Sequence, residues 1–115
     1  MKVPKSGAPV RGSRSGRPVM AVLDALGRRG ALRVGWELVE QPLGFRELQR
    51  RAQISSPSLL TKRLREAAEL GTVRKDAKGR YELTAYGREL VDILLPLEEW
   101  AKRWARRGGA SGRSR

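Results

Sequence analysis

The chain has 115 residues, enough for one domain with a single modest core, and its 25 Lys and Arg against 12 Asp and Glu give a net charge of +13 at pH 7. This excess points to a polyanionic partner, nucleic acid before an acidic membrane surface. Because the sequence contains no Cys and no His, it excludes disulfides, thiol redox sensing, the common zinc sites, and catalysis by a Cys nucleophile or a His base.

The positive charge is concentrated at the two ends of the chain. Residues 1–18 hold five basic residues and residues 102–115 hold six, with no acidic residue in either segment, whereas residues 19–101 carry 14 basic against 12 acidic groups. The end segments have too few bulky apolar side chains to offset the entropy of ordering them. We therefore predict a flexible basic arm over 1–18, a folded domain over 19–106 and a flexible basic tail over 107–115.

The folded part begins with three helical patterns. In the first, apolar residues follow the i, i+3, i+4, i+7 spacing of one helical face before a stop at Gly27, namely Val19, Val22, Leu23 and Leu26. The second pattern runs up to Pro42. Its expected inner face carries Leu32, Trp36 and Val39, and two further apolar residues, Val34 and Leu38, lie beside that face. A short helix over 45–52 follows, with Phe45, Leu48 and Ala52 facing inward.

A turn over residues 53–56 leads into a fourth helix over 56–70. Ser56 suits the N-cap position, Pro57 suits the first helical position, and Gly71 ends the helix. The buried row that holds this helix to the preceding one consists of Leu60, Leu64 and Ala67.

The opposite face of the fourth helix has the chemistry of a DNA reader. It carries, at i, i+3, i+4, i+7, the residues Ser58, Thr61, Lys62 and Arg65. Short hydroxyls allow the helix to approach closely, while Lys and Arg can reach guanine edges or phosphates in a major groove. A plain exposed helix face is the alternative for a single basic helix. Arg63 lies off this face and is expected to serve the flank.

After Gly71 the sequence changes to a strand pattern. Val73, Tyr81 and Leu83 can share one face of a hairpin whose turn contains Lys78 and Gly79. Lys78 and Arg80 are predicted to contact phosphates or the adjacent minor groove, although a charged hairpin can also serve solubility alone. Two helices joined by a four-residue turn and followed by a basic hairpin predict a mainly α fold with a small β-hairpin, a winged helix-turn-helix.

A long last helix begins at Thr84, an expected cap, and contains Pro96, which should kink it. Trp100 and Trp104 lie four residues apart beside Leu97, and a domain of this size has few inner faces left to cover them. We therefore predict that a second copy of the chain packs against these residues and that a two-fold dimer presents two recognition helices to adjacent major grooves.

These motifs together resemble the HxlR-type winged-helix transcriptional regulators, from about Val19 to Trp104. The segment FRELQRRAQISSPSLLTKRLREAAELGTVRKD is similar to that family's start, recognition helix and entry to the wing, and YELTAYGREL resembles its passage into the last helix. Single pieces occur in related winged-helix families, whereas the combination is specific.

The resemblance implies a DNA-binding dimer with the first and last helices at the interface. The expected interface residues are then Val19, Val22 and Leu23 of the first helix and Leu97, Trp100 and Trp104 of the last. By position, the DNA-facing residues are Ser56, Pro57, Ser58, Thr61, Lys62 and Arg65, with Arg80 in the wing. This chain departs from the family in reading RRGAL before the second helix, in its short wing, and in having no Cys. The oxidant sensing of some members therefore cannot apply to it.

The sequence thus predicts a homodimeric, sequence-specific regulator that binds double-stranded DNA and represses by blocking a promoter, with no cofactor, metal or catalytic residue. An effector pocket between the last helix and the body is left open. One alternative is an architectural DNA- or RNA-binding protein that uses its basic ends. An enzyme would need a carboxylate constellation, and Glu37, Glu66 and Asp92 are scattered. No apolar run approaches the roughly 18–20 residues of a membrane span, so we expect a cytoplasmic protein.

Overall fold

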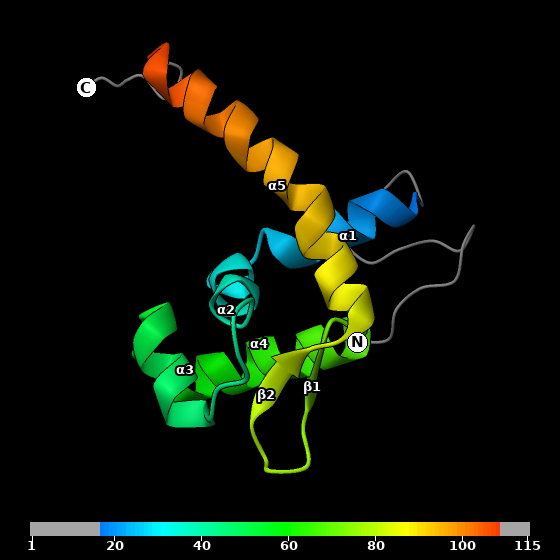
Figure 1. Cartoon of the computed structure of the whole chain (residues 1–115), viewed down its shortest axis with the longest axis vertical. Coiled ribbons are helices and arrows are strands. Elements are labelled where there is room, and N and C mark those ends of the chain that lie inside the picture. Colours follow the sequence, from blue (N-terminus) through cyan, green and yellow to red (C-terminus); the bar gives the residue numbers. More distant parts are fainter. Residues whose placement is uncertain (1–16, 109–115) are drawn as a thin grey trace.

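The computed structural model describes residues 17–108, which form five helices and one hairpin (Figure 1). In chain order the elements are α1 (Pro18–Leu26), α2 (Ala31–Glu37), α3 (Phe45–Ala52), α4 (Pro57–Leu70), β1 (Val73–Lys75), β2 (Tyr81–Leu83) and α5 (Ala85–Arg106). The predicted order of elements and the winged-helix fold class are confirmed. Most of the predicted arm and tail lies outside the described residues, but Pro18 is already the first residue of α1 and Arg107 is the C-cap of α5.

The core gathers around α2, which packs against α1, α3, α4 and α5. Its Val34 and Leu38 are almost fully buried, and they meet Leu48 of α3 and Leu60 of α4 in one cluster. The predicted inner face of this helix was wrong, because Leu32 remains 46% exposed. The helix carries two apolar faces. The one bearing Val34 and Leu38 enters the core, while Leu32 and Trp36 turn toward α5.

The second helix also ends earlier than predicted, at Glu37 instead of near Pro42. The chain then becomes extended, and Leu43 pairs with Tyr81 through two backbone hydrogen bonds of 3.0 and 2.7 Å. This pairing adds a third strand position to the hairpin, in which β1 and β2 are antiparallel with Val73 opposite Leu83.

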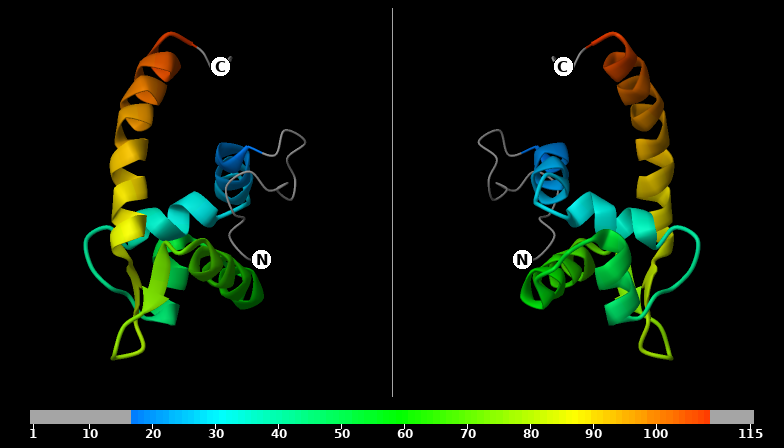
Figure 2. Two further views of the ribbon diagram at one scale, coloured as in Figure 1. Left: turned by 90° about the vertical axis from the view of Figure 1, so that its right-hand side faces the viewer. Right: turned by 90° about the vertical axis from the view of Figure 1, so that its left-hand side faces the viewer.

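The tip of the hairpin and the C-terminal half of the last helix lie at opposite ends of the molecule (Figures 1 and 2). α5 continues through Pro96 as one helix and leaves the body, so that its C-terminal half projects away from α3, α4 and the hairpin. This arrangement separates a basic end, formed by α4 and the wing, from the projecting half of α5.

Candidate nucleic-acid interface

The recognition helix α4 is positioned by signals at its start and along its inner face. Gln53 adopts a left-handed conformation (φ 58°) that ends α3. Ser56 then caps α4, its hydroxyl oxygen accepting from the amide of Leu59 at 3.1 Å, and Pro57 is the first helical residue, as predicted. Leu60 and Leu64 are buried, which holds this helix against α3 and the hairpin.

The predicted reading face is exposed along its length. Ser58, Thr61, Lys62 and Arg65 are all exposed, and Pro57 beside them is exposed as well. The two cations, Lys62 and Arg65, form no ion pair within residues 17–108, although nine such pairs engage eight other basic side chains there. An unpaired cation keeps its charge available for a phosphate or a base edge.

Arg63, also on α4, has a different role from the one expected of it. Its side chain is only 9% exposed. Its guanidinium donates to the carbonyl oxygen of Arg29 at 2.7 Å and pairs with Glu66 at 3.0 Å. The expectation that Arg63 serves the DNA flank was therefore wrong, because it ties α4 to the loop between α1 and α2.

Glu66 extends this anchor to α1. Its second oxygen accepts from Arg28 at 2.7 Å, and Arg28 also pairs with Asp24 of α1 at 3.2 Å. Partial burial opposes the charge of Arg28, but the hydrogen bond to Asp24 and the field of Glu66 outweigh it and raise the pKa of Arg28 above its ordinary value. Sequence reasoning missed this five-residue cluster, whose long-range partners lie 34 and 38 positions apart.

Some charged side chains of the wing are paired within the hairpin and are less available than predicted. Asp76 accepts from the amides of Lys78 and Arg80 at 2.8 and 2.9 Å, and its other oxygen pairs with the Arg80 guanidinium at 3.1 Å. Arg74 pairs with Glu82 across the hairpin at 2.9 Å. Of the two predicted wing contacts, Lys78 is exposed and makes no ion pair among the described residues, whereas Arg80 is already engaged.

The motif Thr84 to Gly87 locks the wing to α5. Thr84 donates its hydroxyl to the carbonyl of Gly71 at 2.6 Å and accepts from the amide of Gly87 at 3.0 Å, which confirms the predicted cap. Gly87 is buried against Thr72 of the strand entry. The wing and the long helix therefore share one rigid junction.

Exposed apolar side chains cover α1 and α5. Of the residues predicted to contact a second copy, Val22 is half-buried and five are between 42% and 55% exposed: Val19, Leu23, Leu97, Trp100 and Trp104. Sequence reasoning missed Tyr86 and Ile93, which are 65% and 64% exposed. At 100° per residue, these two fall on the same side of α5 as Leu97, Trp100 and Trp104. The spacing that reveals this stripe was present in the sequence.

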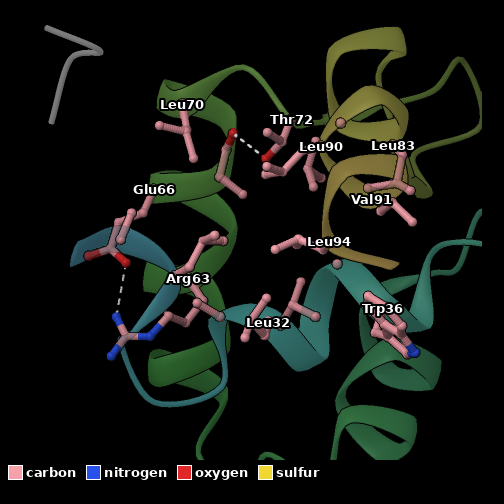
Figure 3. A pocket seen from close by; sticks show the side chains of 18 residues that line it. Leu32, Trp36, Arg63, Glu66, Leu70, Thr72, Leu83, Leu90, Val91 and Leu94 are labelled. Atoms are coloured by element: carbon pink, nitrogen blue, oxygen red, sulfur yellow. Dashed lines mark hydrogen bonds and ion pairs between the residues drawn. The ribbon is translucent and has the colours of Figure 1, made fainter. Parts of the chain in front are cut away.

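Two hollows lie between α5 and the body. Figure 3 shows an apolar pocket of about 60 Å³ between α2, α4 and α5, with Arg63 and Glu66 at its edge. It holds about two water molecules by volume and is too small for a drug-sized ligand. A wider groove of about 400 Å³ is lined by Leu32, Trp36, Leu94 and Leu97 among others.

Within residues 17–108, no group of three or more Asp or Glu side chains is arranged to hold a metal ion. None of the helices in the same range combines the length and the hydropathy needed to cross a membrane.

Comparison with known proteins finds a matching family and a similar regulator. Residues 25–108 match the HxlR-like helix-turn-helix family. The chain is 28% identical over 96 residues to the uncharacterized HTH-type transcriptional regulator YybR of Bacillus subtilis, covering 78% of this chain and 77% of that one.

Two solved structures share the fold. Quinone-bound YodB from B. subtilis has a TM-score of 0.69 at 24% identity, over 74% of this chain and 96% of that one. The redox regulator HypR in its reduced form has a TM-score of 0.63 at 28% identity, over 76% and 93%. The chain therefore belongs to the HxlR-like helix-turn-helix family of DNA-binding transcriptional regulators.

Proposed function

We propose that this chain is a homodimeric repressor that inserts α4 into the major groove of its operator. The observation that carries the proposal is the exposed face of Ser58, Thr61, Lys62 and Arg65, on which neither cation is paired within the described residues. Ser56 and Pro57 place the start of α4, with its free amides, beside the phosphate backbone. Lys78 and Arg80 of the wing add contacts to phosphates or the minor groove.

In this proposal the homodimer forms through α1 and α5. Val19, Val22 and Leu23 of one copy and Leu97, Trp100 and Trp104 of the other cover one another, which removes contiguous apolar surface from water. Such a dimer presents two copies of α4 to successive major grooves on one side of the duplex. Bound over a promoter, it would repress by excluding the polymerase.

The basic ends, residues 1–18 and 107–115, add sequence-independent attraction to phosphate in this proposal. In this proposal, the groove lined by Leu32 and Trp36 is where a small-molecule effector would bind. YodB has been solved with a quinone and HypR is a redox regulator, but this sequence has no Cys with which to sense oxidants through a thiol.

The test is binding to the DNA upstream of the protein's own gene, together with selection of bound duplexes from a random pool. We expect a two-fold-symmetric consensus, and we expect Lys62→Ala or Arg65→Ala to weaken binding or alter its sequence preference by about 1–3 kcal/mol. Arg33→Ala is the matched control, because Arg33 lies on α2 and pairs with Glu37. If neither α4 variant changes binding by about 1 kcal/mol, the face is not a reader.

A second candidate is an architectural protein that binds DNA or RNA through its ends. The observation that favours it is the concentration of positive charge in residues 1–18 and 102–115. Equal affinity for unrelated duplexes, with a salt dependence lost on deleting 1–18 and 105–115, would support this candidate over the repressor.

A further inference from the structure

A groove between α4 and the wing divides the reading face into two parts. It has a volume of about 300 Å³, and its lining includes Thr61 and Arg65 of α4 but neither Ser58 nor Lys62. On the other side it is lined by Lys75 of β1 and Tyr81 of β2. The two halves of the predicted reading face therefore meet different surroundings, although they belong to one helix face.

The chemistry of this groove is that of an anion site. Its floor is apolar, formed by Leu64, Val73 and Ala68, and no carboxylate is among its lining residues. Arg65 and Lys75 are both exposed and make no ion pair with any described residue. Charges beside a low-dielectric floor interact more strongly with an anion than charges surrounded by water.

The wing sets the position of the second cation. The Lys75 ammonium lies 5.5 Å from the centre of the Tyr81 ring, a cation–π distance that keeps it at the groove. Arg74, the next residue, also lines the groove, but its guanidinium pairs with Glu82 at 2.9 Å. Lys75 is thus the cation of β1 at the groove that makes no ion pair with any described residue.

We propose that this groove seats the sugar–phosphate backbone of the bound duplex, with one phosphate held between Arg65 and Lys75. Thr61 donates its hydroxyl to the same phosphate, whereas Ser58 and Lys62, outside the groove, face the bases. This inference rests on the proposed DNA-binding function and refines it. Arg65 becomes a positioning contact and Lys62 the base-reading cation.

The experiment measures affinity for the selected duplex and for a scrambled duplex over a range of salt concentrations. For Arg65→Ala and Lys75→Ala we expect weaker binding to both duplexes by the same factor, so that the preference between them stays within about twofold. We also expect the slope of log affinity against log salt to fall by about 0.9 in the double variant, which leaves that one phosphate without a cation, and to fall by less than this in each single variant. For Lys62→Ala we expect the preference for the selected duplex to fall by about tenfold or more.

Lys102→Ala is the matched control, because Lys102 is an exposed cation that pairs with Glu99 on α5, far from the groove. Its slope should stay at the wild-type value. If it falls as far as in Lys75→Ala, net charge and not the groove explains the effect, and the inference is overturned. A changed base preference in Arg65→Ala overturns it as well.

If the proposed function is wrong, the result is different, because the wild-type protein itself then shows no preference for any selected duplex. That outcome is known before the variants are compared. Thermal melting of each variant shows whether it is folded. Arg65→Gln and Lys75→Gln, which keep most of each side chain and remove the charge, should reproduce the slopes of the alanine variants.

Discussion

Gly87 stands where α5 passes the base of the hairpin, and no side chain fits there. A Cβ at this position would lie 2.2 Å from the backbone carbonyl oxygen of Thr72, which cannot move without disturbing the strand entry. We expect Gly87→Ala to lower the free energy of unfolding by about 1–3 kcal/mol, the usual cost of overpacking a closed site. Chemical denaturation measures this change.

Gly35 provides a matched control for that substitution. It lies inside α2, and a Cβ there meets no atom within 4 Å. Because alanine favours a helix interior over glycine by about 1 kcal/mol, Gly35→Ala should stabilise the protein. Equal effects of the two substitutions would show that the close approach at Gly87 does not limit the fold.

The carboxylate of Asp76 links the stability of the wing turn to pH. Hydrogen bonds from the amides of Arg80 and Lys78, together with the Arg80 guanidinium, lower the pKa of Asp76 below its ordinary value. A carboxylate with a lowered pKa contributes its stability above the ordinary value, about 3.9, and that contribution is lost as the pH falls through the lower folded pKa.

We therefore expect the turn to stay intact at pH values where exposed carboxylates already protonate. The amide proton shift of Arg80, followed by NMR into the acid range, should show a midpoint below the ordinary carboxyl pKa. Asp76→Asn should abolish this transition. A midpoint at or above the ordinary value would contradict the assignment of these hydrogen bonds.

At the scale of elements, local signals predicted most of the fold. The caps at Ser56 and Thr84, the turn over 53–56 and the buried row of α4 depend on residues within a few positions of one another. Each is present, although Ala67 of that row is only partly buried. The exposed part of the candidate site followed from the same spacing. Leu43 shows where such reasoning ends, because its partner Tyr81 is 38 positions away.

The anchor of α4 could not be predicted for the same physical reason. On a helical wheel, Arg63 is one more basic residue beside the reading face. Its contacts with the Arg29 carbonyl and with Glu66, which itself holds Arg28, arise only when the loop after α1 folds over α4. Charge alone therefore does not separate a cation that faces DNA from one that holds the helix in place.

Breaking this anchor should destabilise the protein. Glu66→Gln removes the carboxylate that joins Arg63 to Arg28, and Arg63 is almost fully buried. We expect the free energy of unfolding to fall by about 1–3 kcal/mol, the cost of leaving a buried charged group unsatisfied. Glu37→Gln is the control, because its pair with Arg33 is more exposed and should contribute at most about 1 kcal/mol. A larger loss for Glu37→Gln than for Glu66→Gln would contradict the proposed role of the anchor.

At the scale of the whole molecule, the two ends of the fold differ in surface chemistry. The basic end carries α4 and the wing, while the C-terminal half of α5 projects from the other end (Figure 2). α5 bears one stripe of exposed apolar side chains. Monomeric soluble proteins rarely leave contiguous apolar surface of this kind exposed. A second copy related by a two-fold axis would cover it and would fix the spacing between two copies of α4.

Ile93 and Leu95 allow a matched test of that dimer. Both are exposed leucine-sized side chains on α5, at 64% and 45%, but they point about 200° apart around the helix. Ile93 belongs to the stripe with Trp100, and Leu95 does not.

We expect Ile93→Asp to give a monomer in analytical ultracentrifugation, because a charge at a covered apolar contact has no partner. It should also weaken binding to an operator with two half-sites far more than binding to one half-site. Leu95→Asp introduces the same charge into the same helix and should remain a dimer. If Leu95→Asp dissociates instead and Ile93→Asp does not, the copies meet on the other face of α5.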